Sequence, residues 1–292
     1  MKKQEYLRKR DRLVSILTDD GKYRISLIKN TTTAQTAQKQ HNLDYMSVQY
    51  WAKAASCAIF SSSLLKGEER VTVYIKPETT YTTILAEAMH TGEVRGYVQL
   101  EDNVTVDQIP KTLKPGIFRI DKVLYGKYEP MTGIIKLQEG DITSDYQYFL
   151  TQSDQIASYV WLYTETDEQG QIILSTALLI QAMPGTTQEE INELASTINF
   201  TTLPQLIDSS NPQSILEQLF PQKHSITNNT LLDFYCRCSH KNFKSKLLTF
   251  TQEEIKDMQE QNQREMICHY CNKEYVLTDE DFQDILLQIQ KQ

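Results

Sequence analysis

Cys236-Arg-Cys238 and Cys268-His-Tyr-Cys271 are the two stretches that decide how the last part of this 292-residue chain folds. Only one other cysteine, Cys57, occurs in the sequence, so four of the five thiols belong to two close pairs. Two such pairs supply four thiolates, the ligand set of a closed tetrahedral zinc site that leaves no position for a substrate. Thiolates are also the form of cysteine that oxidants attack. The same residues can therefore bind one Zn²⁺ ion per chain or form two disulfides.

The surrounding segment, residues 232–292, contains few large apolar side chains outside its last helix. Such a small region needs an additional source of stability, and a bound zinc ion would supply on the order of 10 kcal/mol. His240 and His269 lie beside the cysteines and are alternative ligands, but the four cysteines already complete the set. Three basic side chains could stabilise thiolate charge, although solvated surface is their commoner role: Arg237, Lys241 and Lys244.

The spacing of the first pair bears on whether the site is a switch. Zinc knuckles usually place two or more residues between ligands, so the single residue between Cys236 and Cys238 is uncommon. A disulfide within such a pair closes a very small ring, and strain makes it easier to reduce. Most four-cysteine zinc sites are purely structural. The residues by themselves therefore leave a structural site and a redox switch both open.

Composition restricts the class of protein. Lys and Arg number 30 against 38 Asp and Glu, a formal net charge of −8, which gives no general attraction to nucleic acid or to anionic membranes. No apolar stretch of signal-peptide type follows the basic start, and none reaches the length of a membrane span. We therefore expect a cytoplasmic protein. In a reducing compartment, paired cysteines are more often metal-bound or redox-sensing than permanently oxidised.

Residues 1–185 alternate strand patterns with one helical pattern, which predicts an α+β domain of mixed sheets packed on a helix. Residues 43–66 lack Gly and Pro and carry Val48, Trp51 and Ile59 at helical spacing, so a buried helix is predicted. Cys57 lies within it and is expected to pack as a small apolar residue. The predicted strands are 23–28, 71–76, 93–99, 117–124, 158–164 and 171–180.

Residues 186–231 are predicted to form a helical linker. Thr187-Gln-Glu-Glu190 has the form of a capping box, and Asn211-Pro212 is typical of a helix start. Helices this short are marginal alone, because nucleation costs more than a few added residues return. The linker should therefore be metastable and should depend on a neighbour for its fold.

Within residues 232–292, the pattern predicts a strand at 246–250 and a helix opened by a capping box at Thr251. A second strand is predicted at 274–277, followed by a final helix capped by Thr278. These elements and the cysteines define a small C-terminal zinc-binding domain.

The sequence contains no constellation typical of an enzyme, such as a Gly-rich phosphate loop or a Gly-x-Ser-x-Gly turn. We therefore expect a binding protein. A zinc-ribbon adaptor for nucleic acid is one alternative, which the acidic balance disfavours. A thiol–disulfide oxidoreductase using Cys268 and Cys271 is another, but the thioredoxin-like βαβ context is missing.

The chain resembles the heat-shock protein 33 family, the redox-regulated cytosolic chaperones, over most of its length. Cys-Arg-Cys-Ser at 236–239 and Cys-His-Tyr-Cys-Asn-Lys-Glu-Tyr at 268–275 match the zinc centre of that family, including its spacing. Further landmarks occur in the expected order, among them Leu-Lys-Gly-Glu at 65–68, Gly-Glu-Val-Arg-Gly-Tyr-Val at 92–98 and Met-Pro-Gly at 183–185.

The resemblance implies an N-terminal α/β chaperone domain (1–185), a helical linker (186–231) and a C-terminal zinc redox switch (232–292). It implies that the reduced, zinc-bound form is inactive and that oxidation forms the disulfides Cys236–Cys238 and Cys268–Cys271. Zinc would then leave, the linker would unfold, and the chain would dimerise and hold unfolding client proteins without ATP. A divergent paralogue with a purely structural zinc site and a constitutive chaperone or adaptor role is the alternative within the family.

Overall fold

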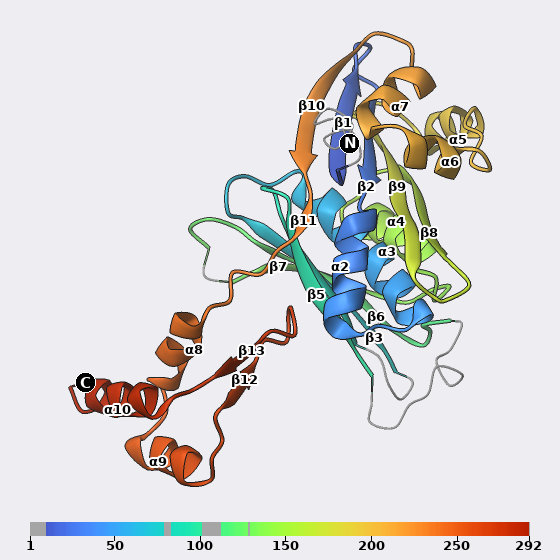
Figure 1. The fold of residues 1–292 in the computed structure, drawn as a ribbon. Coiled ribbons are helices and arrows are strands. Elements are labelled where there is room, and N and C mark those ends of the chain that lie inside the picture. Colours follow the sequence, from blue (N-terminus) through green and yellow to red (C-terminus); the bar gives the residue numbers. More distant parts are fainter. Residues whose placement is uncertain (1–9, 79–82, 101–111, 128, 292) are drawn as a thin grey trace. The chain divides into compact units, whose positions relative to one another are not determined.

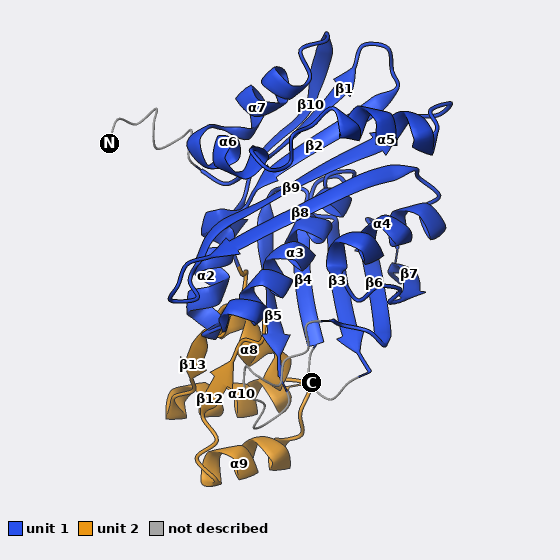
Figure 2. Ribbon diagram, turned by 90° about the vertical axis from the view of Figure 1, so that its right-hand side faces the viewer, with its two compact units in different colours: residues 1–235 blue, residues 236–292 orange. Residues whose placement is uncertain are grey.

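The computed structural model describes residues 10–78, 83–100, 112–127 and 129–291. The chain forms two compact units, residues 1–235 and residues 236–292, which are coloured separately in Figure 2. Both units combine helices with strands, so the predicted α+β class is confirmed. In the described part of the chain, no helix is long and apolar enough to cross a bilayer.

The first unit contains a five-stranded antiparallel sheet in the order β10-β1-β2-β9-β8 (Figure 1). Its strands are β1 (Arg12–Thr18), β2 (Tyr23–Lys29), β8 (Ser158–Thr166), β9 (Ile172–Ala182) and β10 (His224–Leu231). Strand β10 comes from the segment predicted to be a helical linker. The prediction is therefore wrong for these last eight residues, which pair with β1 along its full length.

A second sheet, of six strands, follows the order β11-β5-β4-β3-β6-β7. Its strands are β3 (Arg70–Pro77), β4 (Thr83–Met89), β5 (Glu93–Gln99), β6 (Gly116–Val123), β7 (Met131–Lys136) and β11 (Asp233–Phe234). Strand β11 pairs in parallel with β5, and its Phe234 ring lies 5.7 Å from the indole of Trp51. The chain between β10 and Cys236 is thus attached to an edge of each sheet.

The main core lies around helix α3 (Tyr45–Ser62), which packs against strands of both sheets. Asp44 caps it by accepting hydrogen bonds from the backbone N–H groups of Met46 and Ser47. Trp51 is fully buried and donates its indole N–H to the carbonyl of Leu85. Two further helices border this core: α2 (Thr31–His41) and α4 (Ile142–Gln152).

Three helices of the linker cover the other face of the five-stranded sheet: α5 (Gln188–Ser196), α6 (Leu203–Ser209) and α7 (Pro212–Leu219). The capping box at Thr187 and the cap at Asn211 are confirmed. The linker helices and the residues just after them bury eight side chains in the cluster they share with the sheet: Ile191, Ala195, Ile198, Leu203, Ile207, Ile215, Leu216 and Phe220. The buried ammonium of Lys29 donates hydrogen bonds to the carbonyls of Ile207 and Asp208 at the end of α6. The linker helices, which belong to the first unit, therefore take their apolar contacts from its five-stranded sheet.

The second unit is small. Its elements are α8 (His240–Leu247), α9 (Gln252–Glu260), α10 (Asp279–Ile289) and a hairpin of β12 (Glu265–Ile267) with β13 (Glu274–Val276). The predicted capping box at Thr251 and the predicted cap at Thr278 are confirmed, and Thr278 also forms a capping box with Asp281. The strand predicted at 246–250 is wrong, because Ser239 caps a helix that runs through Leu247.

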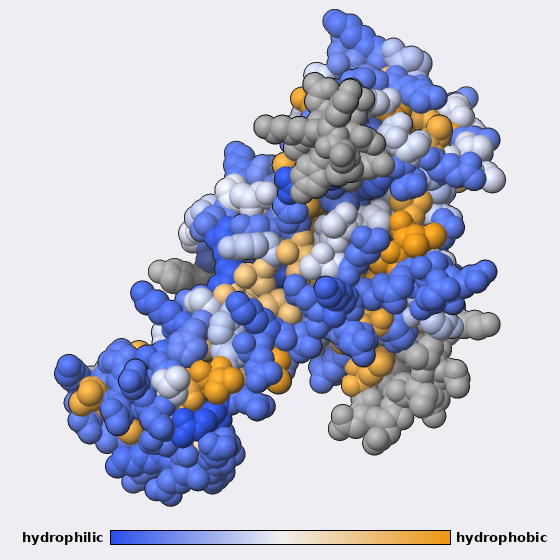
Figure 3. All heavy atoms as spheres, viewed as in Figure 1, coloured by the Kyte–Doolittle hydropathy of each residue, from blue (hydrophilic) through white to orange (hydrophobic). Residues whose placement is uncertain are grey.

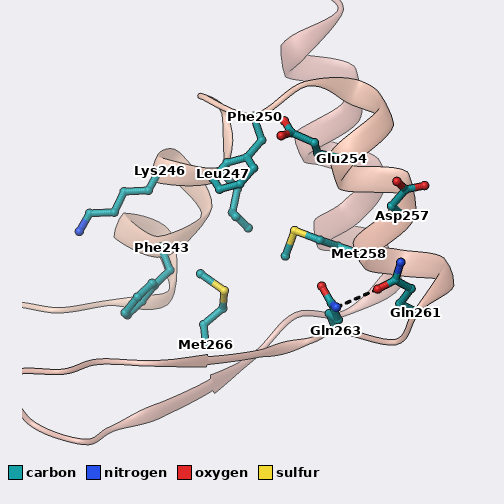
Figure 4. A pocket seen from close by; sticks show the side chains of 10 residues that line it. All are labelled: Phe243, Lys246, Leu247, Phe250, Glu254, Asp257, Met258, Gln261, Gln263 and Met266. Atoms are coloured by element: carbon teal, nitrogen blue, oxygen red, sulfur yellow. Dashed lines mark hydrogen bonds between the residues drawn. The ribbon is translucent and has the colours of Figure 1, made fainter.

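Few apolar side chains fill this second unit. Its buried cluster comprises Leu247, Ile255, Leu277, Phe282 and Ile285. Figure 4 shows a pocket of ≈ 570 Å³ beside this cluster, where side chains from α8, α9 and β12 face one another without closing the space. Most residues on the visible face of each unit are hydrophilic (Figure 3). Apolar packing in this unit is thus thin and incomplete.

Candidate metal centre

The four cysteines predicted as ligands lie together in the second unit. Cys236 and Cys238 precede α8, while Cys268 and Cys271 lie in the loop that joins β12 to β13. Their four Sγ atoms all lie within 4.8 Å of one another. The Sγ atoms of Cys236 and Cys268 are 3.7 Å apart, and those of Cys238 and Cys271 are 3.4 Å apart. Residues 32 and 33 positions apart in the chain are thus brought into one cluster.

The second pair is positioned by a tight turn in the hairpin loop. The N–H of Cys268 donates to the carbonyl of Lys273 at 2.9 Å, and the N–H of Asn272 donates to the carbonyl of Cys268 at 2.7 Å. Asn272 adopts a left-handed backbone conformation with φ of 54°, which asparagine tolerates better than most residues. This turn directs both thiols to the same side of the loop. Cys268 and Cys271 are each only 7% exposed.

The first pair is held by polar contacts from α8 and β13. Ser239 caps α8, and the side-chain amide of Asn242 donates to the carbonyl of Arg237 at 3.1 Å. The hydroxyl of Tyr275 donates to the carbonyl of Cys238 at 3.1 Å and lies 3.2 Å from its Sγ atom. Tyr275 thus connects the hairpin to the first cysteine pair.

The donor set fits a thiophilic cation. A zinc ion bound to four thiolates at about 2.3 Å in a tetrahedron separates neighbouring sulfur atoms by roughly 3.8 Å. The distances of 3.7 and 3.4 Å between sulfur atoms are already close to this value. Four cysteines in this arrangement can hold a metal ion with little movement of the chain.

The pKa values of the thiols indicate why a cation is needed. Burial would raise the pKa of Cys238, but hydrogen bonds from Tyr275 and the neighbouring thiols outweigh burial and lower it. Burial raises the pKa of Cys268 and of Cys271, and the nearby charge of Cys236 raises both further. The thiolate of Cys238 therefore forms readily, while Cys268 and Cys271 resist ionisation. A bound cation would remove this repulsion and favour all four thiolates.

The other candidate residues lie outside the cluster. The only group of possible metal ligands found in the described residues consists of the four cysteines, without either histidine. The Nε2 atom of His240 lies 3.2 Å from a carboxylate oxygen of Asp281, and Lys244 forms ion pairs with Asp281 and Asp284. Cys57 is fully buried in α3, as predicted, and burial raises the pKa of its thiol well above the ordinary value.

Tyr275 and Asn242 also hold the first cysteine pair in place, although no such role was predicted for them from the sequence. Tyr275 follows Cys271 by four residues, and its hydroxyl reaches Cys238 only because β13 folds back beside the start of α8. Asn242 occupies the first turn of α8, whose start could be recognised from Ser239 as an N-cap. The position of Asn242 could thus be inferred from the Ser239 cap, whereas the contact made by Tyr275 depends on tertiary structure.

Comparison with known proteins gives the family. A family model described as Hsp33 protein matches residues 11–278. The chain belongs to the Hsp33 family. The resemblance seen in the cysteine motifs is therefore confirmed.

Curated relatives and a solved structure agree with this family. Proteins named 33 kDa chaperonin from Bacillus velezensis and Bacillus subtilis are 27% and 28% identical over 285 residues. Each alignment covers 94% of this chain and 98% of the relative. The crystal structure of the 33 kDa chaperonin (heat shock protein 33 homolog) from Thermotoga maritima matches with a TM-score of 0.82 at 22% identity. That match covers 97% of this chain and all of the other, so the fold is shared along the whole length.

Proposed function

We propose that this protein is a redox-switched holdase, which binds unfolding proteins without ATP and acts by binding rather than by catalysis. Its membership of the Hsp33 family and the name chaperonin given to its relatives support a chaperone role. We place it in the cytoplasm, where reducing conditions would keep the four thiols available for a metal until an oxidant appears.

The observation that carries this proposal is the cluster of four sulfur atoms in a unit with very little apolar core. We assign one Zn²⁺ ion to Cys236, Cys238, Cys268 and Cys271, because four thiolates in a tetrahedral set are its usual structural ligands. Zinc binding at such sites contributes on the order of 10 kcal/mol to folding at neutral pH. Losing the metal would therefore remove most of the stability of residues 236–292.

Oxidation would form the disulfides Cys236–Cys238 and Cys268–Cys271, as in the family pattern. The alternative pairing, Cys236–Cys268 with Cys238–Cys271, joins the sulfur atoms at 3.7 and 3.4 Å. That alternative would cross-link the hairpin loop to the segment before α8 and keep the unit closed. Pairing within each motif leaves those two segments unconnected, so it is the pairing that allows the unit to open.

Opening of the second unit would affect the linker because the two segments are joined by a short stretch of chain. Only Tyr235 separates Cys236 from β11, and only Leu232 separates β11 from β10, so the folded second unit restrains the end of the linker. Without that restraint, the linker helices are short and hold the sheet by one apolar face. We propose that their release uncovers apolar surface for unfolding clients and permits a homodimer to form.

Zinc-loaded full-length chain treated with peroxide and mild warming tests the proposal. We expect one zinc ion to leave per chain, peptide mapping to give Cys236–Cys238 and Cys268–Cys271, and aggregation of an unfolding client to be suppressed. A matched Cys57→Ser variant should behave as the parent, since Cys57 is buried in α3. Zinc release without any gain in client holding would refute the switch.

A further inference from the structure

Strand β10 is an unusual edge strand, because none of its eight side chains is buried. Its sequence, His-Ser-Ile-Thr-Asn-Asn-Thr-Leu, is mostly polar, and its two large apolar residues are Ile226 and Leu231, 45% and 37% exposed. The strand opposite, β1, has five buried residues: Leu13, Val14, Ser15, Ile16 and Thr18. The two paired strands thus contribute very unequally to the core.

What holds β10 in place is mainly its backbone. It pairs antiparallel with β1 from Arg12–Leu231 to Thr18–His224, with an irregularity between Ser15 and Ile16. The hydroxyl of Thr227 donates to the carbonyl of Ser15, and the Asn229 side chain donates to Gln213 on α7. The edge of β1 therefore holds an extended strand mainly through backbone hydrogen bonds. The side chains of β10 contribute little to this pairing.

An apolar surface continues from this edge across the sheet. The paired strands place Val14 beside Leu27 and Leu178, and Ile16 beside Ile25 and Ile180. These six buried residues form the layer that the linker helices cover. On β10, the positions opposite Val14 and Ile16 are Asn229 and Ile226, both exposed. A strand with apolar residues at those positions would extend the layer, whereas β10 does so poorly.

We propose that the edge of β1 is a client-binding site, which takes up an extended segment of an unfolding protein as an antiparallel strand in place of β10. This inference rests on the proposed function, because release of the linker would remove β10 and the helices that cover the apolar layer together. Strand addition supplies backbone hydrogen bonds to any sequence, and the adjoining layer favours segments with an apolar residue at every second position. Such segments are common in unfolding proteins and rare on folded surfaces.

The test locks β10 onto β1 in a full-length chain whose four zinc ligands are changed to serine. In that chain, Arg12→Cys with Leu231→Cys places a cysteine pair at directly opposite positions of the two strands. The probe is a fluorescent eight-residue peptide of alternating valine and threonine with lysine at both ends. We expect peptide binding with the pair reduced, and an affinity weaker by roughly tenfold or more after oxidation with diamide.

The matched control is Asp121→Cys with Thr132→Cys in the same four-serine chain. These residues lie directly opposite each other on β6 and β7, so their disulfide links two strands of the six-stranded sheet and leaves β1 untouched. We expect this disulfide to leave peptide affinity unchanged. Equal affinity in the locked and unlocked Arg12–Leu231 chain would overturn the inference.

Further outcomes of the experiment distinguish failure of strand addition from failure of the proposed holdase function on which it rests. A reduced chain that suppresses client aggregation but does not bind the peptide would overturn strand addition and leave the holdase intact. Failure to suppress aggregation at all would instead count against the holdase. A lock that converts a dimer into a monomer without changing peptide affinity would assign the edge to a second copy of the chain, which also overturns the inference.

Discussion

The two units of this protein are stabilised in different ways. The first unit has a continuous apolar core around Trp51 and a second apolar layer under the linker helices. The second unit has five buried apolar residues and four sulfur atoms within 4.8 Å of one another. Apolar packing does not respond to oxidants, whereas a thiolate cluster does. We therefore propose that redox sensitivity is confined to the second unit while the apolar core keeps the rest of the chain folded.

The linker is the part of the first unit that leads to the second. Its helices bury their apolar residues against the five-stranded sheet, and the chain then runs through β10 and β11 to Cys236. We propose that the metal centre controls how firmly the end of the linker is held, while the apolar contacts of the linker helices lie within the first unit.

The largest expected effect is on the second unit alone. With all four zinc ligands changed to serine, residues 236–292 should lose their fold, because on the order of 10 kcal/mol of metal-dependent stability is removed. Hydrogen exchange should show fast exchange throughout 236–292 and continued protection in β2 and β9. A four-serine chain whose second unit remains protected would show that apolar packing suffices there.

A core substitution should do the reverse. Trp51→Ala should lower the free energy of unfolding of the first unit by about 3 to 5 kcal/mol, because it leaves a cavity where a fully buried indole packed. Zinc content and thiol reactivity should be unchanged from the parent. Denaturant titration together with metal analysis checks both statements, and loss of zinc from this variant would break the division between the units.

Acid should also affect the two units oppositely. Burial raises the pKa of Asp11 from 3.8 to about 6, although hydrogen bonds from Thr33 oppose the shift. The folded state therefore binds this proton more tightly than the unfolded state, and its contribution to stability falls as the pH rises through this range. Asp11→Asn should remove about 2 to 3 kcal/mol of that pH dependence.

Tryptophan fluorescence measures this effect in the first unit alone, since both tryptophans, Trp51 and Trp161, belong to it. The second unit should respond with the opposite sign, because protonation of its thiolates weakens metal binding at low pH. An Asp11→Asn chain with the same pH profile as the parent would exclude Asp11 as the source.

The smallest expected effect concerns Tyr275. Tyr275→Phe removes the hydroxyl that bonds the carbonyl of Cys238 and lies beside its sulfur atom, a loss of about 1 kcal/mol. Zinc should be released at a lower peroxide concentration, with the fold of both units unchanged. Peroxide titration with a colorimetric zinc indicator measures the shift. Phe243→Leu, which changes the ring packed 5.2 Å from Tyr275, controls for altered packing.

The parts of the fold that local signals specify could be predicted from the sequence. The predicted capping boxes at Thr187 and Thr251 and the predicted cap at Thr278 mark helix starts through contacts within four residues, and all three are present. The cysteine ligands were recognisable because spacing in the chain is itself the signal. The alternating strands at 71–76 and 93–99 were likewise found as β3 and β5.

The parts that were missed depend on distant partners. Strand β10 is polar, and only its pairing with β1, about two hundred residues earlier, makes it a strand. Helix α2 is rich in threonine and glutamine and offers no apolar stripe, so its place beside the core could not be read locally. The wrong strand at 246–250 has a local cause, since the Ser239 cap starts a helix that runs into an apolar stretch that also fits a strand.

The most direct test of the account is hydrogen exchange on the full-length, zinc-loaded chain before and after peroxide, with zinc counted in the same samples. We predict that protection disappears together in residues 236–292 and 188–231 as zinc leaves, while β2, β9 and α3 stay protected. Complete zinc release with α5, α6, α7 and β10 still protected would contradict the claim that the metal centre controls the linker.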